Sequence, residues 1–432
     1  MKYYSLNKTA PPVDFKEATI RGLAPDKGLY FPEVVPKFDE EFIQNINSYS
    51  NEEIAFQVIK PYVSDVIPEG ELKRIVAETV NFDIPLVKVN DKIFSLELFH
   101  GPTMAFKDIG ARFMSRCLGY FVKGNKQKIT VLVATSGDTG GAVASGFYNV
   151  EGVEVVILYP SGKVSLVQEK QLTTLGNNIH ALEIKGNFDD CQKMVKQAFA
   201  DEKLNKHLFL TSANSINVAR WLPQQFYYLF AYKQWANKSN PPVISVPSGN
   251  FGNICAGILA HLSGMPVQHF IAACNANDVV TEFLKTENYQ TKKAVATISN
   301  AMDVGDPSNF IRILELLNHE FSGLKNLMSS YSVSDNQTRE TIKNIFDKEH
   351  YLPDPHGAVA YFALNEYLQQ HPQQAGMFLE TAHPVKFYDV VEPVIGEVIP
   401  IPEPLKPLME KDKRSILMEA DFQQLSEFLM NR

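Results

Sequence analysis

The stretch ITVLVATSGDTGG, residues 129–141, joins an apolar run to a turn of small and polar residues. Ile129–Ala134 is apolar except for Thr130, as is typical of a strand buried on both faces of a parallel sheet. The following Ser, Asp and Gly residues favour a tight turn. A helix is expected next, over Gly140–Tyr148. This order of strand, turn and helix is typical of an α/β fold.

The same order recurs along the middle of the chain. Short apolar runs bounded by turn residues predict further strands at Val153–Tyr159, Asn178–Ile184, Val243–Val246 and Gln268–Ala273. Helix-length segments are expected at Leu166–Leu175, Phe188–Ala200, Val218–Trp235 and Asn253–Leu262. The repeated alternation predicts an α/β protein with parallel sheets that are covered by helices.

The two ends of the sequence differ from its middle. Residues 1–92 are richer in charge and proline, contain an amphipathic stretch at Asn51–Val63, and are interpreted as a separate N-terminal domain. Ile399–Pro404 is a Pro-rich stretch that predicts an extended connector before a short helical tail. We expect three domains: residues 1–92, a small α/β domain over 93–235, and a large α/β domain over 236–432.

Composition excludes several classes of protein. With 432 residues, 45% of them hydrophobic, the chain is long enough for two or three domains. The net charge of -8 argues against nucleic-acid binding, which needs clustered excess Lys and Arg. No apolar run approaches the roughly 20 residues that cross a bilayer, and the first residues lack the apolar core of a secretory signal. The four cysteines lie far apart, which predicts reduced thiols and no metal site. We therefore expect a cytoplasmic protein with no membrane partner.

Two turns of small residues are candidate anion sites. Residues 134–141 follow one predicted strand, and residues 246–253, VPSGNFGN, follow another. The start of a helix presents unpaired N–H groups and the positive end of the helix dipole, so such turns bind anions. Neither matches a dinucleotide fingerprint or a nucleoside-triphosphate loop. The glycines equally fit turns that serve the fold alone.

A third candidate is HGPTMAFKD, residues 100–108, where a Gly-Pro turn leads into a helix-compatible stretch. Lys107 falls in the opening turns of that helix, where a cation is electrostatically misplaced. This placement lowers the pKa of an amine, and imine formation requires the neutral amine. Most lysines are solvated surface residues, so Lys107 alone does not establish a site. The residues themselves indicate an enzyme with a small anionic ligand.

The motifs in their order resemble those of one enzyme family. The chain is similar to threonine synthases of the shorter microbial type, which belong to the tryptophan-synthase-β-like (fold type II) pyridoxal-phosphate enzymes. The segments that carry the resemblance are Gly22–Pro32, Glu97–Thr103 with Phe106–Asp108, Ser136–Gly140, Ser212–Asn217, Ser248–Asn253, Ser299–Val304 and Thr381–Pro384. The resemblance spans nearly the whole chain. It implies two parallel-sheet domains with the cofactor in the cleft between them, and a small N-terminal domain.

The resemblance implies cofactor-binding roles. Lys107 resembles the lysine that forms an imine with pyridoxal 5′-phosphate and later moves protons between substrate carbons. Thr381 matches the hydroxyl residue that meets the pyridine nitrogen, which suits elimination and replacement, although an ordinary turn cap also fits. Asp138 matches a position near the cofactor O3′, where many relatives have Asn. The residues similar to the cofactor-phosphate loop are Ser248, Gly249, Asn250, Phe251, Gly252 and Asn253.

Substrate-binding roles follow in the same way. Ser136, Gly137 and Thr139 are similar to the loop that binds the substrate carboxylate. Asn214, Ser215 and Arg220 resemble the group that binds the substrate phosphate, and the planar fork of Arg suits a phosphate. An exposed Arg220 stacked on Trp221 is the alternative. The family-like residues to which no role is assigned are Lys163, Asn300–Val304 and His383.

The implied reaction converts O-phospho-L-homoserine and water to L-threonine and phosphate, in a monomer or homodimer. Three alternatives stay open. A related lyase would release 2-oxobutanoate and ammonia. A serine or threonine dehydratase would not need the phosphate-binding Arg220. A binding protein without catalysis would lack the absorbance of the cofactor.

Overall fold

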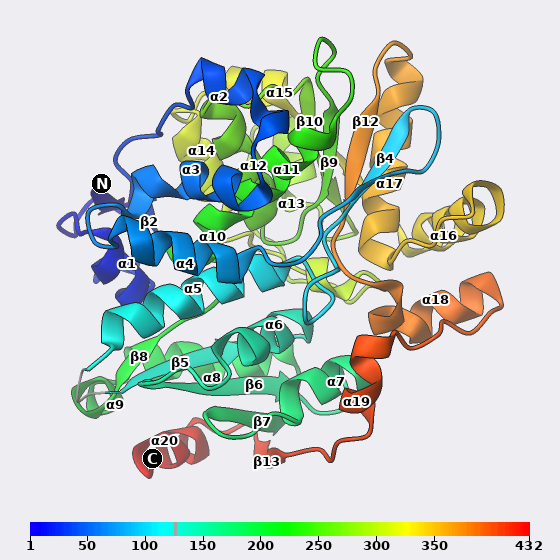
Figure 1. Cartoon of the computed structure of the whole chain (residues 1–432). Helices are drawn as coiled ribbons and strands as arrows, with labels where there is room; N and C mark the ends of the chain where they lie inside the picture. Colours follow the sequence, from blue (N-terminus) through cyan, green and yellow to red (C-terminus); the bar gives the residue numbers. More distant parts are fainter. Residues whose placement is uncertain (125–127) are drawn as a thin grey trace. The chain divides into compact units, whose positions relative to one another are not determined.

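The structure is a computed structural model that describes residues 1–124 and 128–432. The chain divides into two compact units, and each unit consists of non-consecutive segments (Figure 1). Unit 1 contains Met1 with residues 31–106 and 221–400, and unit 2 contains residues 2–30, 107–220 and 401–432. Both units therefore mix segments of the three expected domains, and the expected division at residues 92 and 235 stays a prediction.

Unit 1 is built on a six-stranded sheet in the order β11-β10-β9-β12-β4-β3. Its strands are β3 (Leu86–Lys88), β4 (Ile93–Glu97), β9 (Val243–Pro247), β10 (His269–Cys274), β11 (Met328–Ser332) and β12 (Gly376–Glu380). All neighbours pair in parallel except β3, which runs antiparallel to β4. The carboxyl ends of β9, β10, β12 and β4 consequently meet at one edge, where ligands of parallel sheets bind.

Helices cover both faces of this sheet. On one face α17 (Pro355–Gln370) packs on β9, β10 and β12, and α16 (Asp335–Glu349) packs on α17. On the other face lie α11 (Gln225–Gln234) and α12 (Gly252–Leu262) (Figure 1). The start of α17 is fixed by Asp354, whose side chain accepts the N–H of Gly357 at 2.7 Å. Val359 and Leu364 of α17 and Phe378 of β12 belong to one fully buried apolar cluster.

Shorter elements complete unit 1. Its other helices are α2 (Glu40–Gln44), α3 (Asn51–Val63), α4 (Glu69–Thr79), α13 (Val279–Thr286), α14 (Phe310–Leu316), α15 (Phe321–Leu327) and α18 (Tyr388–Ile395). Its 3-10 turns are η1 (Ile46–Ser48), η2 (Leu222–Gln224), η3 (Asn300–Met302) and η4 (Pro384–Phe387). The expected amphipathic stretch at Asn51–Val63 is confirmed as α3, which begins with a capping box between Ser50 and Glu53.

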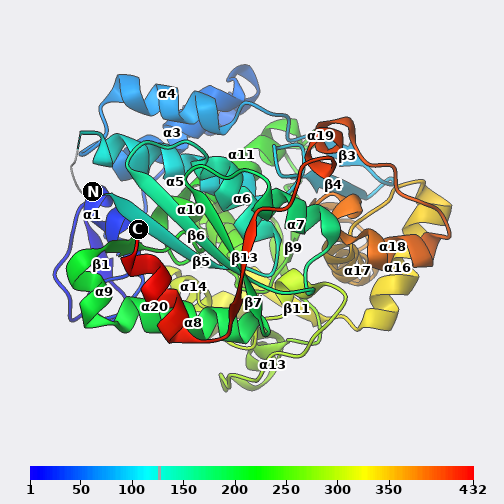
Figure 2. The same ribbon diagram turned by 90° about the horizontal axis from the view of Figure 1, so that it is seen from below.

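Unit 2 is built on a five-stranded sheet in the order β13-β7-β6-β5-β8, with every pair parallel. The strands are β5 (Ile129–Ala134), β6 (Val153–Pro160), β7 (Ile179–Lys185), β8 (Phe209–Thr211) and β13 (Ser415–Glu419). One face carries α5 (Lys107–Val122), α6 (Asp138–Phe147) and α7 (Leu166–Thr173). On the other face, α20 (Phe422–Met430) lies beside α8 (Phe188–Ala200) (Figure 2). The remaining elements of the chain are β1 (Tyr3–Ser5), α1 (Phe15–Arg21), β2 (Tyr30–Pro32), α9 (Glu202–His207), α10 (Val218–Trp221), η5 (Glu403–Leu405) and α19 (Lys406–Met409).

The predicted α/β class and parallel sheets are confirmed. The expected strand at Ile129–Ala134 and the expected helix at Phe188–Ala200 match β5 and α8. The single helix expected over Val218–Trp235 is wrong, because the chain forms α10, η2 and α11 there. Pro223 lies in η2 and has no N–H to donate to a continuous helix. Across residues 1–124 and 128–432, no helix is long and apolar enough to cross a membrane.

Candidate active site

The turn after β9 forms the start of α12 in unit 1. The N–H of Ser248 donates to the carbonyl of Ala273 at 2.8 Å, and the Ser248 hydroxyl donates to the carbonyl of Val246 at 2.8 Å. Phe251, the residue before α12, has the left-handed φ of 61°. The chain thereby turns directly from strand to helix, and the first N–H groups of α12 have no partner within the helix. This is the geometry of an anion site.

Asn253 gives this site a second polar feature. Its side-chain Oδ1 and its carbonyl both accept from the Tyr228 hydroxyl, at 2.8 and 2.9 Å. Its Nδ2 is buried and has no hydrogen-bond partner among the described residues. Burying a donor without an acceptor costs about 1–3 kcal/mol, which a phosphate oxygen at the start of α12 would offset. The turn Ser248–Asn253 therefore fits the phosphate group of a cofactor.

Gly249 is required because another backbone segment packs against it. A Cβ at this position would lie 2.6 Å from the Cα of Met302 and 3.2 Å from the carbonyl oxygen of Ala301. Both residues belong to η3, and the N–H of Ala301 donates to Nε2 of His356 at 3.2 Å. The family-like segment Asn300–Val304 thus supports the turn after β9 by packing.

The segment of unit 1 that directly precedes Lys107 is held by hydrogen bonds to its backbone. The N–H of Phe106 donates to the carbonyl of Thr381 at 2.9 Å, and the N–H of His383 donates to the carbonyl of Met104 at 3.1 Å. The Tyr227 hydroxyl donates to the carbonyl of Phe106. Phe106 is thus fixed to the segment that follows β12, and Lys107 is the next residue of the chain.

Two polar residues near this segment are removed from solvent to different degrees, since Lys386 is buried and His383 is half-buried. Lys386 is fully buried, and its Nζ donates to the carbonyl of Thr103 at 2.8 Å. His383 accepts the N–H of Val385 on Nδ1 at 3.1 Å. Burial lowers the pKa of His383 to about 4, so its imidazole is neutral at pH 7.

In unit 2, Lys107 is the first residue of α5, and Asp138 is the first residue of α6. Nζ of Lys107 lies 3.9 Å from Oδ2 of Asp138, and the two side chains are 16% and 4% exposed. The Asp138 carboxylate attracts the protonated amine of Lys107. The start of α5 acts in the opposite direction, because the positive end of a helix dipole repels a cation. The structure thus brings together two of the residues expected to meet the cofactor.

Gln168 holds Asp138 in place and was not found from the sequence. Its Nε2 donates to Oδ1 of Asp138 at 2.9 Å, and both side chains are buried. Gln168 also packs on Gly137, where a Cβ would lie 2.5 Å from the Gln168 amide carbon and where φ is 136°. The sequence signal at Gln168 is a capping box with Ser165 at the start of α7, which does not reveal a contact with Asp138.

The loop after β5 is stabilised by Thr135, whose hydroxyl accepts the N–H groups of Gly137 and Gly140 at 3.0 and 2.9 Å. Ser136 and Thr139 on this loop are half-buried. Because all strands of unit 2 are parallel, this loop lies at the same edge as the segment after β8. That segment contains Asn214 and Ser215.

Arg220 is buried in unit 2, at 4% exposure, so the alternative of an exposed arginine is wrong. Its Nη1 donates to the carbonyl of Ala213, which brings it to the expected Asn214-Ser215 group. The Oδ1 of Asn214 is buried without a hydrogen-bond partner among the described residues. Trp221 is instead covered by another guanidinium, that of Arg312, at 4.4 Å from the ring centroid. Lys163 is exposed in the turn after β6.

Three family models match the chain. Residues 2–80 match the threonine synthase N terminus, residues 81–378 match pyridoxal-phosphate dependent enzymes, and residues 357–429 match the C-terminal part of threonine synthase. The first of these confirms the expected small N-terminal domain.

Relatives and solved structures agree with the family models. Threonine synthase of Serratia marcescens is 44% identical over 431 residues, which cover 100% of this chain and 99% of that protein. The crystal structure of threonine synthase from Escherichia coli is similar with a TM-score of 0.93 and 42% identity, over 100% of both chains. The structure of threonine synthase with bound pyridoxal phosphate from Brucella melitensis has a TM-score of 0.94 and 34% identity, and the match covers 100% of this chain and 99% of that one.

Proposed function

Because the chain belongs to the threonine synthase family of pyridoxal-phosphate-dependent enzymes, we propose that it converts O-phospho-L-homoserine and water to L-threonine and phosphate. Family membership makes the chain a pyridoxal-phosphate-dependent enzyme. The substrate follows from the family resemblance of the motifs. The observation that carries the proposal is the 3.9 Å approach of the Lys107 amine to Asp138, each at the start of a helix of unit 2.

Lys107 is proposed as the catalytic residue. Pyridoxal phosphate, when bound, withdraws electrons from the substrate carbons and so makes their protons acidic. The Lys107 amine, once free, removes one proton from Cα of the substrate and releases it before it takes another from Cβ. It returns one proton at Cγ after phosphate leaves and one at Cα after water has added its hydroxyl to Cβ, and the remaining proton of that water goes to the released phosphate. An amine suits both directions of transfer because it accepts and donates a proton at the same atom. The hydrogen bonds of Phe106 support this role, since they fix the backbone that precedes Lys107.

The cofactor phosphate is proposed to bind to the turn Ser248–Asn253. The N–H groups of Gly249, Asn250, Phe251 and Gly252 and the buried Nδ2 of Asn253 are the donors. The start of α12 supports this proposal, because its dipole favours an anion. A polar donor with no protein partner supports it independently.

Thr381 and Asp138 are proposed to orient the cofactor ring. A hydroxyl at Thr381 is a weak proton donor, so it leaves the pyridine nitrogen largely unprotonated. Asp138 is proposed to lie near O3′ when the cofactor is bound, where the carboxylate and that oxygen would share one proton. The hydrogen bond from Gln168 supports this role, because it fixes one carboxylate oxygen and leaves the other, Oδ2, toward Lys107.

The substrate is proposed to bind to unit 2 through its two anionic groups. Ser136, Gly137 and Thr139 bind the carboxylate at the start of α6, which, like the start of α12, directly follows a strand of a parallel sheet. Asn214, Ser215 and Arg220 bind the phosphate. The hydrogen bond of Arg220 to Ala213 supports this grouping, since it holds the guanidinium beside that segment.

The proposed working environment is the cytoplasm, with the protein as a monomer or homodimer and no nucleic-acid partner. All four cysteines are buried free thiols, which suits a reducing compartment.

A product assay tests the proposed reaction. Purified protein with bound cofactor is given O-phospho-L-homoserine, and released phosphate and threonine are measured. We expect equal amounts of both, and we expect Lys107→Ala to lose at least about 10³-fold in rate, as for loss of a proton-transfer group. Lys196→Ala, on the exposed surface of α8, is the matched control and should keep its rate. Formation of 2-oxobutanoate and ammonia in place of threonine would show a lyase, and persistence of the rate in Lys107→Ala would overturn the assignment.

A further inference from the structure

Arg312 is a fully buried cation in unit 1. Charged side chains are almost never fully buried unless they are paired, because burial removes their hydration. Burial lowers the pKa of the Arg312 guanidinium to about 10, so it still carries its proton at neutral pH. Its Cζ lies 4.4 Å from the centroid of the Trp221 ring, over the face of that ring. The contacts that hold this buried cation therefore show which part of unit 1 it supports.

One hydrogen-bond path leads from Arg312 to the turn after β9. Nη1 of Arg312 donates to Oδ1 of Asn309 at 2.7 Å. Asn309 is itself fully buried, and its Nδ2 and its backbone N–H both donate to the carbonyl of Asn250, at 3.1 and 3.3 Å. The Asn250 side chain is also bound, because its Oδ1 accepts the N–H of Ser308 at 2.6 Å.

These bonds determine which way the turn presents its backbone. The Asn250–Phe251 peptide is trans, so its carbonyl and its N–H point in opposite directions. Because Asn309 binds the carbonyl of Asn250, the N–H of Phe251 is directed away from Asn309. A carbonyl turned the other way would present a negative dipole end to an anion. The contact of the Phe251 ring with Phe310, at 5.6 Å and nearly edge-on, holds the same turn at its next residue.

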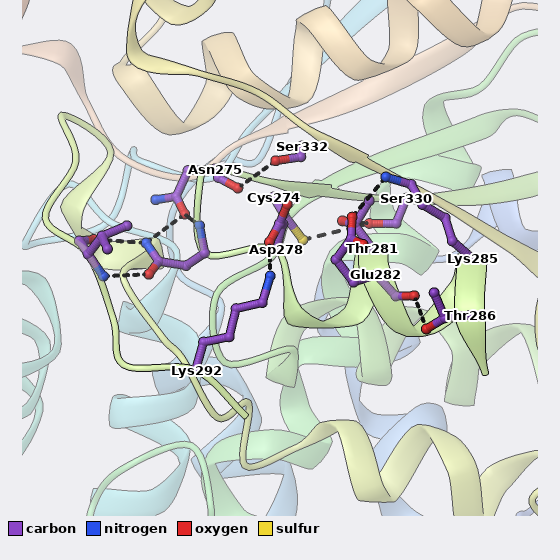
Figure 3. Close-up of polar contacts among 12 residues, drawn as sticks. Cys274, Asn275, Asp278, Thr281, Glu282, Lys285, Thr286, Lys292, Ser330 and Ser332 are labelled. Atoms are coloured by element: carbon purple, nitrogen blue, oxygen red, sulfur yellow. Dashed lines mark hydrogen bonds and ion pairs between the residues drawn. The ribbon is translucent and has the colours of Figure 1, made fainter. Parts of the chain in front are cut away.

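The opposite side of the turn is supported by a different set of contacts. There η3 packs on Gly249, and the residue after η3, Asp303, accepts Nδ2 of Asn275 at 2.9 Å. Figure 3 shows Asn275 at the end of β10, where its carbonyl accepts the Ser332 hydroxyl of β11 at 3.2 Å. This support consists of backbone packing on Gly249 and hydrogen bonds to the Asp303 carboxylate, whereas the support from the Arg312 side includes a buried guanidinium.

We propose that Arg312 is a positioning residue for the cofactor phosphate, which acts through Asn309 on the carbonyl of Asn250. It keeps the N–H of Phe251 directed to the anion, and its positive charge adds to the attraction of the α12 start. The proposal rests on the proposed role of Ser248–Asn253. Arg is required in preference to Lys, because a planar guanidinium stacks on Trp221 and donates to Asn309 at the same time.

The test compares two ligands that differ only in the phosphate. Apoprotein of Arg312→Gln and Arg312→Lys is titrated with pyridoxal phosphate and with pyridoxal, and binding is followed by cofactor absorbance. We expect the Kd of pyridoxal phosphate to rise by about 10- to 100-fold and the Kd of pyridoxal to change by less than about twofold. Arg339→Gln, an exposed arginine of α16, is the matched control and should match the wild type for both ligands.

Further variants separate the possible failures. Asn309→Ala removes the residue that links Arg312 to the turn and leaves the cation in place. It should weaken binding of pyridoxal phosphate more than binding of pyridoxal, and it provides a test if Arg312→Gln does not fold. Equal weakening of both ligands in Arg312→Gln and Asn309→Ala would overturn the proposal, since it would indicate general structural damage. Asn253→Ala tests the turn itself. If Asn253→Ala weakens pyridoxal phosphate and the Arg312 variants do not, the positioning role alone is wrong. If none of these variants affects pyridoxal phosphate, the phosphate assignment of Ser248–Asn253 is wrong as well.

Discussion

Replacement of Gly249 by alanine adds one methyl group at the point where η3 packs on the proposed cofactor-phosphate turn. The new Cβ would lie 2.6 Å from Cα of Met302, 3.1 Å from its carbonyl carbon and 3.2 Å from the carbonyl oxygen of Ala301. Ordinary contact begins at 3.4 Å. All three opposing atoms are backbone atoms, so no side chain can rotate away, and the turn or η3 must shift by about 1 Å.

The cost of this shift sets the expected effect. Overpacking by one methyl group in a well-packed region costs about 1–3 kcal/mol. If the turn alone moves, the cost falls on cofactor binding, and about 1.4 kcal/mol per factor of ten gives a Kd for pyridoxal phosphate about 5- to 150-fold higher. If η3 moves, the cost falls on the free energy of unfolding of the apoprotein. The two measurements together should account for the whole effect.

The assay is a titration of apoprotein with pyridoxal phosphate, together with urea unfolding of the same preparation. Gly70→Ala in α4 is the matched control, because nothing lies within 4 Å of its added Cβ. That change should leave the Kd unchanged and raise the free energy of unfolding by about 0.5–1 kcal/mol, as for glycine in a helix. Wild-type values of both quantities in Gly249→Ala would refute the argument from backbone packing.

Two further perturbations have defined expected outcomes. Gln168→Leu removes the hydrogen bond to the buried Asp138 carboxylate. We expect the free energy of unfolding to fall by about 1–3 kcal/mol and the rate of threonine formation to fall as well. Gln197→Leu, at an exposed residue of α8, is the control and should change neither quantity. A wild-type rate in Gln168→Leu would contradict the role of this contact. His383 has a pKa of about 4 in the folded protein because of burial, against about 6.5 in the unfolded chain, so only the unfolded chain gains a proton at that residue between these pH values. Stability is therefore lost as pH falls from about 6.5 to about 4, and His383→Asn should show a smaller drop of Tm between pH 7.5 and pH 5.0; identical drops would disprove the linkage.

Much of the fold could be predicted because fully buried parallel strands are apolar and β-branched. Strand β5 has that pattern, and its bounds were predicted without error. Not every buried strand was predicted, since β12 is buried along its whole length and was missed. Strands β11 and β13 were missed because they have the opposite pattern. MSSYS in β11 is half polar, and SILME in β13 lies at a sheet edge with Ile416 and Leu417 exposed. Edge strands need no continuous apolar run, so their pairing is invisible in a single sequence.

The candidate site could be predicted where function depends on a motif and could not where it depends on long-range contacts. The turns after β5 and β9 show their small residues locally, and both turns lead into helices as expected. Arg312 and Gln168 have no such signal. Each becomes informative only through a partner far away in the chain, Trp221 for Arg312 and Asp138 for Gln168. The role of a residue that holds a site residue in place depends on tertiary contacts, and hydrophobic periodicity in the sequence does not reveal those contacts.

The interleaved segments of the two units affect how the chain folds during synthesis. Met418, Leu425 and Leu429, from β13 and α20, share one buried core with Leu132 of β5. A ribosome that adds about 5–20 residues per second needs roughly 15–60 s to travel from position 132 to position 425. The apolar surface that β13 and α20 later cover, which includes α8, stays exposed on the nascent chain until those two elements are made. Because exposed apolar surface promotes aggregation, we expect newly made chains to need a chaperone until synthesis of residues 401–432 is finished.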